Sequence, residues 1–177
     1  MSELEIHHHG GHEEEDPIGK KIGVMAAVIA IFLSGVTILS HRSHTAAVVE
    51  KTEANNQWSY FQAKKIRLHN YELGKDMMQL MAPKSEASEA KIVKYEQQVK
   101  RYEKEGDQIQ EKAREHDKES LLQEERALRF DLGEGFLELG LVLTSLYFVS
   151  KKKLFPAMGI VGAVLGVVLG IAGLMTH

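Results

Sequence analysis

Two carboxylates inside an apolar segment are the residues best placed for chemistry. Glu134 and Glu138 are the only charged residues of Leu132–Ser150. Residues four apart lie on one face of a helix, and acids at membrane depth usually face a bundle interior or an aqueous cavity. We therefore expect one of two roles. The pair either forms part of a ring that lines a cation path or binds a divalent cation, or it lies among the lipid headgroups.

The N-terminal segment holds a second group of chemical interest, a tract of histidines. Residues 1–16 also contain six acids and the pair Gly10-Gly11, and the histidines are His7, His8, His9 and His12. Imidazoles bind zinc, nickel and copper ions, but the tract lacks the ligand spacing of a defined metal site. Its composition is typical of disorder. Two interpretations stay open: a metal-responsive segment, and an incidental run of histidines.

The rest of the sequence offers no catalytic motif. No Ser/His/Asp set, His-Glu-x-x-His pair or glycine-rich nucleotide loop occurs at the required spacing. There is no cysteine, which excludes disulfides and thiolate metal sites. Residues 41–131 contain 17 Lys and Arg against 17 Asp and Glu, a balance that argues against nucleic acid as a partner. We expect neither enzymatic activity nor a cofactor.

Three apolar segments indicate an all-α integral membrane protein. Ile22–Ser40 and Leu154–Met175 contain no charge, and about 20 apolar helical residues cross a bilayer. Strand-type alternation is missing. The expected segments are a disordered tail (1–21), a first transmembrane helix (22–40), an extramembrane helical hairpin (41–131), a second transmembrane helix (132–150), a loop (151–153) and a third transmembrane helix (154–175).

Cations near the ends of these segments predict the orientation. One side of the predicted membrane carries five cations, Lys20, Lys21, Lys151, Lys152 and Lys153. The other side carries three, Arg42, Arg126 and Arg129. The side with more Lys and Arg is usually cytoplasmic. We therefore expect the N-terminus and the loop in the cytoplasm and the hairpin in the periplasm.

Heptad patterns predict that residues 41–131 form two long helices. In the first helix, position a is occupied by Val49, Asn56, Ala63, Asn70 and Met77. Position d is occupied by Thr52, Ser59, Ile66, Leu73 and Leu80. Pro83 stops this helix, and Ser85 is a suitable N-cap for the next one.

The second helix has a more regular seam that continues into the apolar segment after it. Its a positions are Ile92, Val99, Gly106, Ala113, Ser120 and Ala127. Its d positions are Tyr95, Tyr102, Ile109, His116, Gln123 and Phe130. We therefore expect one rod from Glu86 to Ser150. A short turn between two seams indicates an antiparallel coiled-coil hairpin, which would form a stalk.

Two further surfaces predict a homo-oligomer. Trp58, Phe61 and Leu68 form an apolar stripe outside the predicted seam, which suggests further partners; alternatively, they cover the back of the hairpin's own second helix. Gly162, Gly166 and Gly170 form a small-residue face that allows close helix approach in lipid. These glycines would otherwise face lipid, or meet Gly133 and its neighbours in the second apolar helix.

Two motifs resemble a bacterial membrane family. They are Asn56-Gln57-Trp58-Ser59-Tyr60-Phe61-Gln62-Ala63-Lys64 and Arg129-Phe130-Asp131-Leu132-Gly133-Glu134, and they are similar to domain of unknown function 4337. The resemblance covers nearly the whole chain and implies a bacterial inner-membrane location. It implies no activity, because the family has none assigned. The third apolar segment is richer in glycine than we expect of the family.

These observations favour a structural role. The leading expectation is a non-enzymatic, homo-oligomeric inner-membrane scaffold that projects a coiled-coil stalk. The first alternative is an oligomeric cation channel in which Glu138 forms an intramembrane ring. The second is a metal-responsive accessory protein that uses the histidine tract. The expected partners are the lipid bilayer, further copies of the chain and, for both alternatives, a divalent cation.

Overall fold

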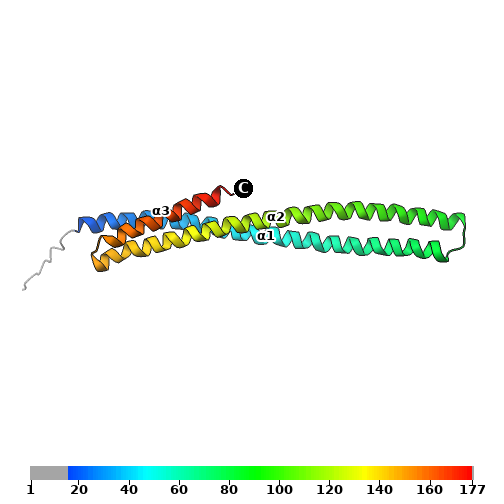
Figure 1. The fold of residues 1–177 in the computed structure, drawn as a ribbon, viewed down its shortest axis with the longest axis horizontal. Helices are drawn as coiled ribbons and strands as arrows, with labels where there is room; N and C mark the ends of the chain where they lie inside the picture. The colour runs from blue at the N-terminus through cyan, green and yellow to red at the C-terminus, as the bar shows by residue number, and fades with distance from the viewer. Residues whose placement is uncertain (1–15, 177) are drawn as a thin grey trace, which may run out of the picture.

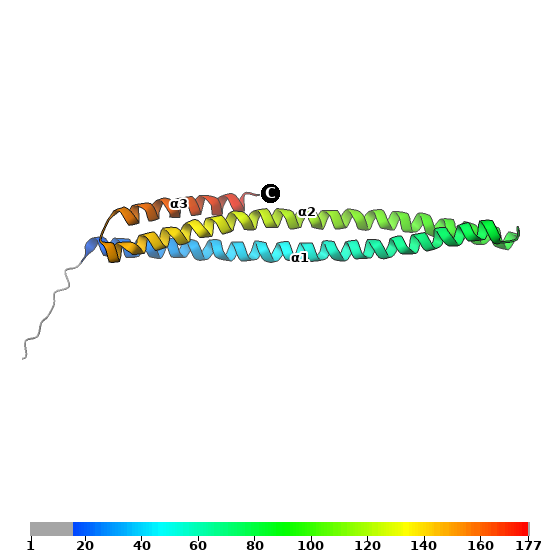
Figure 2. The ribbon, with the colours of Figure 1, turned by 60° about the horizontal axis from the view of Figure 1, so that its bottom comes forward.

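The computed structural model describes residues 16–176, which form three helices and no strand. They are α1 (Pro17–Met81), α2 (Glu86–Ser150) and α3 (Leu154–Leu174). Each contains a stretch long and apolar enough to cross a membrane, so the prediction of an all-helical chain with three such segments is confirmed. α1 and α2 lie side by side over their length, and α3 folds back along one end of the pair (Figures 1 and 2).

α1 begins earlier than the predicted end of the disordered tail. Asp16 is its N-cap and accepts hydrogen bonds from the backbone N–H groups of Ile18 (3.1 Å) and Gly19 (2.8 Å). Pro17 occupies the first turn, where its missing N–H costs nothing. Residues 17–21, expected in the tail, are therefore helical. The helix then continues through Ile22–Ser40 into the charged region without a break.

The turn between α1 and α2 follows the prediction. α1 ends at Met81, and Ser85 caps α2: its hydroxyl accepts from the Ser88 N–H (3.2 Å) while the Ser88 hydroxyl accepts from the Ser85 N–H (3.0 Å). This reciprocal pair satisfies two backbone donors that a helix start otherwise leaves unbonded. α2 then runs unbroken for 65 residues to Ser150, about 97 Å at 1.5 Å per residue.

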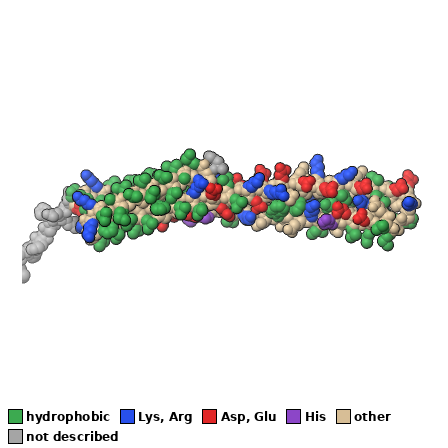
Figure 3. Space-filling model, viewed as in Figure 1, with side chains coloured by type: hydrophobic (Ala, Val, Ile, Leu, Met, Phe, Trp, Pro, Cys, Tyr) green, Lys and Arg blue, Asp and Glu red, His purple; other side chains and the backbone are tan. Residues whose placement is uncertain are grey.

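The molecule has two parts that differ in surface chemistry. Where all three helices lie together, which we call the three-helix end, hydrophobic side chains dominate the surface (Figure 3). Residues 41–131 of α1 and α2 form the two-helix segment, where acidic and basic side chains intermingle (Figure 3). The core of the three-helix end contains Ile29, Val36 and Leu137, and Phe130 joins it at the border with the two-helix segment.

The predicted inner seam is right for α2 and wrong for α1. All twelve predicted seam positions of α2 are buried or half-buried. All ten predicted for α1 are exposed, with Ile66 at 63 % and Leu73 at 57 % exposure. α1 instead turns Ala47, Ala54, Phe61 and Leu68 toward α2.

Side-chain size explains the face that α1 presents. Ala47, Ala54 and Leu68, all buried, and the half-buried Phe61 recur every seven residues, so they form a heptad stripe of their own. Phe61 packs where α2 has Gly106: a Cβ at Gly106 would lie 3.6 Å from the Phe61 ring. Ser120 donates a buried hydrogen bond to the Ala47 carbonyl (3.1 Å). The inner face therefore alternates small and large residues that fit α2, and the stronger apolar heptad faces outward.

Candidate functional site

The acids near the three-helix end differ sharply in their surroundings. Glu134 is half-buried and accepts a hydrogen bond from the Thr37 hydroxyl of α1 (2.8 Å). Glu138 is exposed, and within residues 16–176 it has no hydrogen bond or ion pair. It lies seven residues beyond Asp131, or about 10 Å further along α2. The predicted pair therefore divides into a bonded acid and an outward-facing acid.

Glu138 is turned away from α3. The residues of α2 that contact α3 include Gly133, Leu137 and Gly140, and Glu138 lies on another face of α2. Arg126 and Arg129 lie more than two turns earlier and do not reach it. Arg126 donates to the Thr176 carbonyl (2.8 Å), and Arg129 to Glu125 (2.6 Å) and the Ala172 carbonyl. A partner for Glu138 would have to come from outside the described chain.

A polar cluster lies where the apolar part of α1 ends. Asp131 accepts hydrogen bonds from the Ser40 hydroxyl (2.5 Å) and pairs with His44 (2.9 Å). The sequence did not indicate this cluster, since nothing in the spacing of residues 91 positions apart indicates contact. The cluster joins α1 and α2 at the border between the three-helix end and the two-helix segment.

The glycines of α3 pack inside the chain. A Cβ at Gly166 would lie 2.6 Å from the Gly133 carbonyl oxygen, and one at Gly162 would lie 3.2 Å from the carbonyl oxygen of Phe136. Gly170 meets Val36 of α1. Gly162, Gly166 and Gly170 therefore pack within one chain, and their packing between copies stays a prediction. They serve the close approach of α3 to α2 and α1, as small residues do between apolar helices.

The aromatic stripe of α1 is also used within the chain. Trp58 donates its indole N–H to Asp117 (2.9 Å), and its ring stacks edge-on against Phe61 (centroids 5.8 Å apart). Leu68 is only 3 % exposed. Trp58, Phe61 and Leu68 therefore take part in the contact with α2, which was the alternative. Their packing against another copy stays a prediction.

Several hydrogen-bonded charged pairs connect α1 and α2 in the two-helix segment. Lys64 of α1 donates to Glu105 (2.6 Å), which also accepts from Arg101 (2.7 Å). The hydrogen bond from Lys64, followed by that from Arg101, lowers the pKa of Glu105. The hydrogen bond from Trp58, followed by that from Lys51, lowers the pKa of Asp117. The seam residue His116 pairs with Glu50 (2.7 Å).

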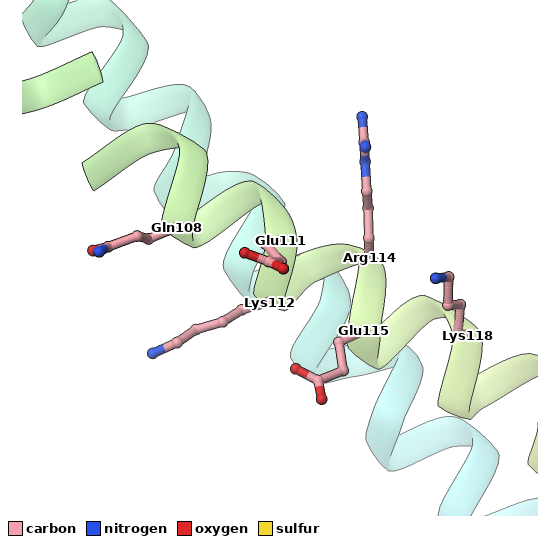
Figure 4. A pocket seen from close by; sticks show the side chains of 6 residues that line it. All are labelled: Gln108, Glu111, Lys112, Arg114, Glu115 and Lys118. Atoms are coloured by element: carbon pink, nitrogen blue, oxygen red, sulfur yellow. The ribbon is translucent and has the colours of Figure 1, made fainter. Parts of the chain in front are cut away.

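One hollow of the two-helix segment is lined by α2 alone. Its six lining side chains all project from consecutive turns of α2 and spread in different directions (Figure 4). They are Gln108, Glu111, Lys112, Arg114, Glu115 and Lys118. One helix alone supplies them, so no second element fixes a ligand between them.

The predicted metal tract cannot be placed. His7, His8, His9 and His12 lie outside the described residues. Within residues 16–176, no three His, Asp or Glu side chains are grouped to hold a metal ion. The metal-responsive interpretation therefore stays a prediction.

Comparison with known proteins bears on the family. No curated protein and no solved structure matches the chain. A family model matches residues 18–176, which include nearly all of α1, all of α2 and all of α3, and leave out the histidine tract. The match agrees with the resemblance noted at Asn56–Lys64 and Arg129–Glu134. The chain therefore belongs to the family described as Domain of unknown function (DUF4337).

Proposed function

We propose that this protein is a non-enzymatic, homo-oligomeric scaffold of a bacterial inner membrane. Its N-terminus lies in the cytoplasm, and the two-helix segment stands in the periplasm as a stalk. The observation that carries the proposal is the outward heptad of α1: Ala63, Asn70 and Met77 at position a, and Ile66, Leu73 and Leu80 at position d, all exposed. A helix that has already buried one stripe against α2 needs a second partner for such a stripe.

The partner that fits this stripe is the same helix of a second copy. Copies anchored in one membrane share an orientation, so their α1 helices run parallel and at equal height. Equal residues then face each other, as a–a′ and d–d′ layers do in a parallel coiled coil. Ile66, Leu73 and Leu80 would form apolar layers between the two hairpins.

Asn70 gives this arrangement its register. In parallel two-stranded coiled coils, a single Asn at position a pairs with its counterpart and disfavours other registers and higher oligomers. Asn70 is exposed and has no hydrogen bond within residues 16–176, so its amide is available for that pairing. The stalk would thus be a four-helix assembly, with α1 of each copy at the centre and α2 outside.

Disulfide crosslinking in native membranes tests the assembly. The chain has no cysteine, so single substitutions are unambiguous. We expect Leu73→Cys and Leu80→Cys to give an oxidised species of twice the 19.8 kDa monomer mass. Val93→Cys, at an apolar position of α2 that is about as exposed as Leu73 (52 % against 57 %), is the matched control and should stay monomeric. A monomeric Leu73→Cys, or equal crosslinking of Val93→Cys, would contradict the proposal.

A second candidate function is an ion conduit formed by the same oligomer. It is favoured by Glu138, an exposed carboxylate in the apolar part of α2 with no partner within residues 16–176. Acids at such depth usually face a neighbouring helix or water. Glu138→Gln should abolish cation flux through reconstituted vesicles while leaving the Leu73→Cys crosslink intact. Equal flux through vesicles with and without the wild-type protein would remove this candidate.

A further inference from the structure

A groove at the border of the three-helix end combines two arginines with an apolar wall. Its volume is about 330 Å³, and all three helices contribute to it. Arg42 and Ser43 come from α1, Arg126 and Phe130 from α2, and Leu174 from α3. The sequence had indicated the arginines only as markers of orientation.

The groove is polar at one end and apolar at the other. Along α1, Leu39 precedes Arg42 by one turn on the side of the apolar segment. Along α2, which runs the opposite way, Phe130 follows Arg126 by one turn on that same side. Leu39 and Phe130 therefore line the end toward the three-helix end, and the two guanidinium groups lie toward the two-helix segment. Leu174, the last residue of α3, adds a third apolar side chain to the groove. This order matches a molecule with an apolar tail and a charged head.

The charge of the groove is positive and largely uncompensated. None of its lining residues is acidic. Within residues 16–176, Arg42 has no hydrogen bond or ion pair. Arg126 uses its Nε to donate to the Thr176 carbonyl (2.8 Å), which leaves its terminal amino groups available. Three acids close to these arginines along the helices have partners of their own: Glu125 pairs with Arg129 (2.6 Å), Glu50 with His116 (2.7 Å) and Asp131 with His44 (2.9 Å).

We propose that this groove binds the phosphate group of an anionic phospholipid. Guanidinium groups bind phosphate oxygens in a bidentate manner, and basic pockets between membrane helices bind anionic headgroups. The phosphodiester lies between Arg42 and Arg126, and an acyl chain runs along Leu39, Phe130 and Leu174. Two positive charges without a carboxylate favour a headgroup of net negative charge over a zwitterionic one.

Bound lipid would also fasten α3 to α1. The two helices contact each other sparsely, whereas α2 touches both. A phosphate held by Arg42 of α1 beside Arg126, which itself holds the end of α3, would link the three elements at this border.

Native mass spectrometry of the full chain in neutral detergent tests the proposal. Phosphatidylglycerol and phosphatidylcholine are titrated in parallel. We expect adducts with phosphatidylglycerol at concentrations about tenfold lower than with phosphatidylcholine, a difference typical of a charge-assisted contact. Arg42→Gln and Arg126→Gln should each remove that preference, and Arg42→Lys should keep part of it, because lysine retains the charge but not the planar fork.

The controls separate this site from other sources of binding. Arg67→Gln changes an exposed arginine in the two-helix segment and should behave as wild type. If Arg67→Gln lost the preference for phosphatidylglycerol to the same extent, general surface charge would explain the binding. That result would overturn the proposed site. Displacement of phosphatidylglycerol by millimolar inorganic phosphate would identify a free-phosphate site and overturn the lipid assignment. Circular dichroism of each variant shows that the helices remain, so that a lost adduct reports on the groove.

Discussion

Trp58 of α1 donates its indole N–H to the carboxylate of Asp117 on α2 across 2.9 Å. The other carboxylate oxygen of Asp117 accepts from Lys51 (2.9 Å). The single tryptophan of the chain thus forms a cross-helix bond in the two-helix segment, and its ring covers Phe61. An aromatic side chain that would mark a docking surface by its sequence position is instead part of the contact between α1 and α2.

Removing that bond should weaken the contact between α1 and α2 in a way that depends on Asp117. Trp58→Phe keeps an aromatic ring but no donor, so the melting temperature followed by circular dichroism should fall. Asp117→Asn should lower it as well, and the double variant should lose less than the sum of both, because the two residues share one interaction. Strictly additive losses would show that the bond contributes nothing.

The pH dependence of stability should reflect Glu105. Its pKa is lowered, chiefly by the hydrogen bond from Lys64 and then by that from Arg101. A carboxyl with a lower pKa in the folded state contributes stability above its ordinary pKa of 4.5. It loses that contribution as the pH falls below 4.5 and through the folded-state value. Asp117 acts the same way below its ordinary value of 3.8.

The expected result is a melting temperature that drops as the pH is lowered from 6 to 3. In Glu105→Gln the drop should be smaller, since that variant lacks the titrating group. Glu103→Gln, at an exposed position two residues earlier, is the matched control and should follow the wild type. Identical curves for wild type and Glu105→Gln would contradict the assignment.

The sequence predicts the inner face of α2 correctly but not that of α1. The heptads of α2 predict its inner face because Gly106, Ala113 and Ala127 leave a single stripe that can approach another helix closely. α1 carries two stripes, and their periods are equal. The sequence alone ranks them by hydrophobicity, which favours Ile66 and Leu73, whereas shape complementarity with α2 favours Ala54 and Leu68. Periodicity reveals that a helix has a seam, but the partner's side-chain volumes decide which seam is inside.

For the candidate sites, too, the sequence indicates single residues but not the residues that they contact. Glu138 and the glycines of α3 could be recognised from their residue types and depth. Their neighbours could not, because Gly133 and Gly166 meet only through the packing of α3 on α2. The groove at Arg42 and Arg126 joins positions 84 residues apart, and no local pattern connects them.

Gly166 of α3 should tolerate no side chain. Gly166→Val would place its Cβ 2.6 Å from the Gly133 carbonyl oxygen and 2.7 Å from Leu137, and overpacking of this kind costs about 1–3 kcal/mol or more. Gly35→Val is the control, since nothing lies within 4 Å of a Cβ there. Unfolding in a detergent titration should shift for Gly166→Val only. Equal shifts would place α3 elsewhere.

Two apolar residues of α1, two positions apart, should separate folding from assembly. Leu68 is 3 % exposed and faces α2, whereas Ile66 is 63 % exposed. Leu68→Ala should reduce the free energy of unfolding by about 2–5 kcal/mol, because it removes buried apolar atoms and leaves a cavity. Ile66→Ala should change the stability of an isolated chain by less than about 0.5 kcal/mol, as is usual for exposed positions.

The difference appears when association is measured. In light scattering over a dilution series, Ile66→Ala should dissociate at higher protein concentration than wild type, because it removes a d–d′ layer between copies. An Ile66→Ala variant that unfolds like Leu68→Ala would mean that the outer stripe is part of the chain's own core. An Ile66→Ala variant that neither unfolds nor dissociates would mean that the outer stripe holds no second copy, and assembly would then have to depend on the three-helix end and Glu138.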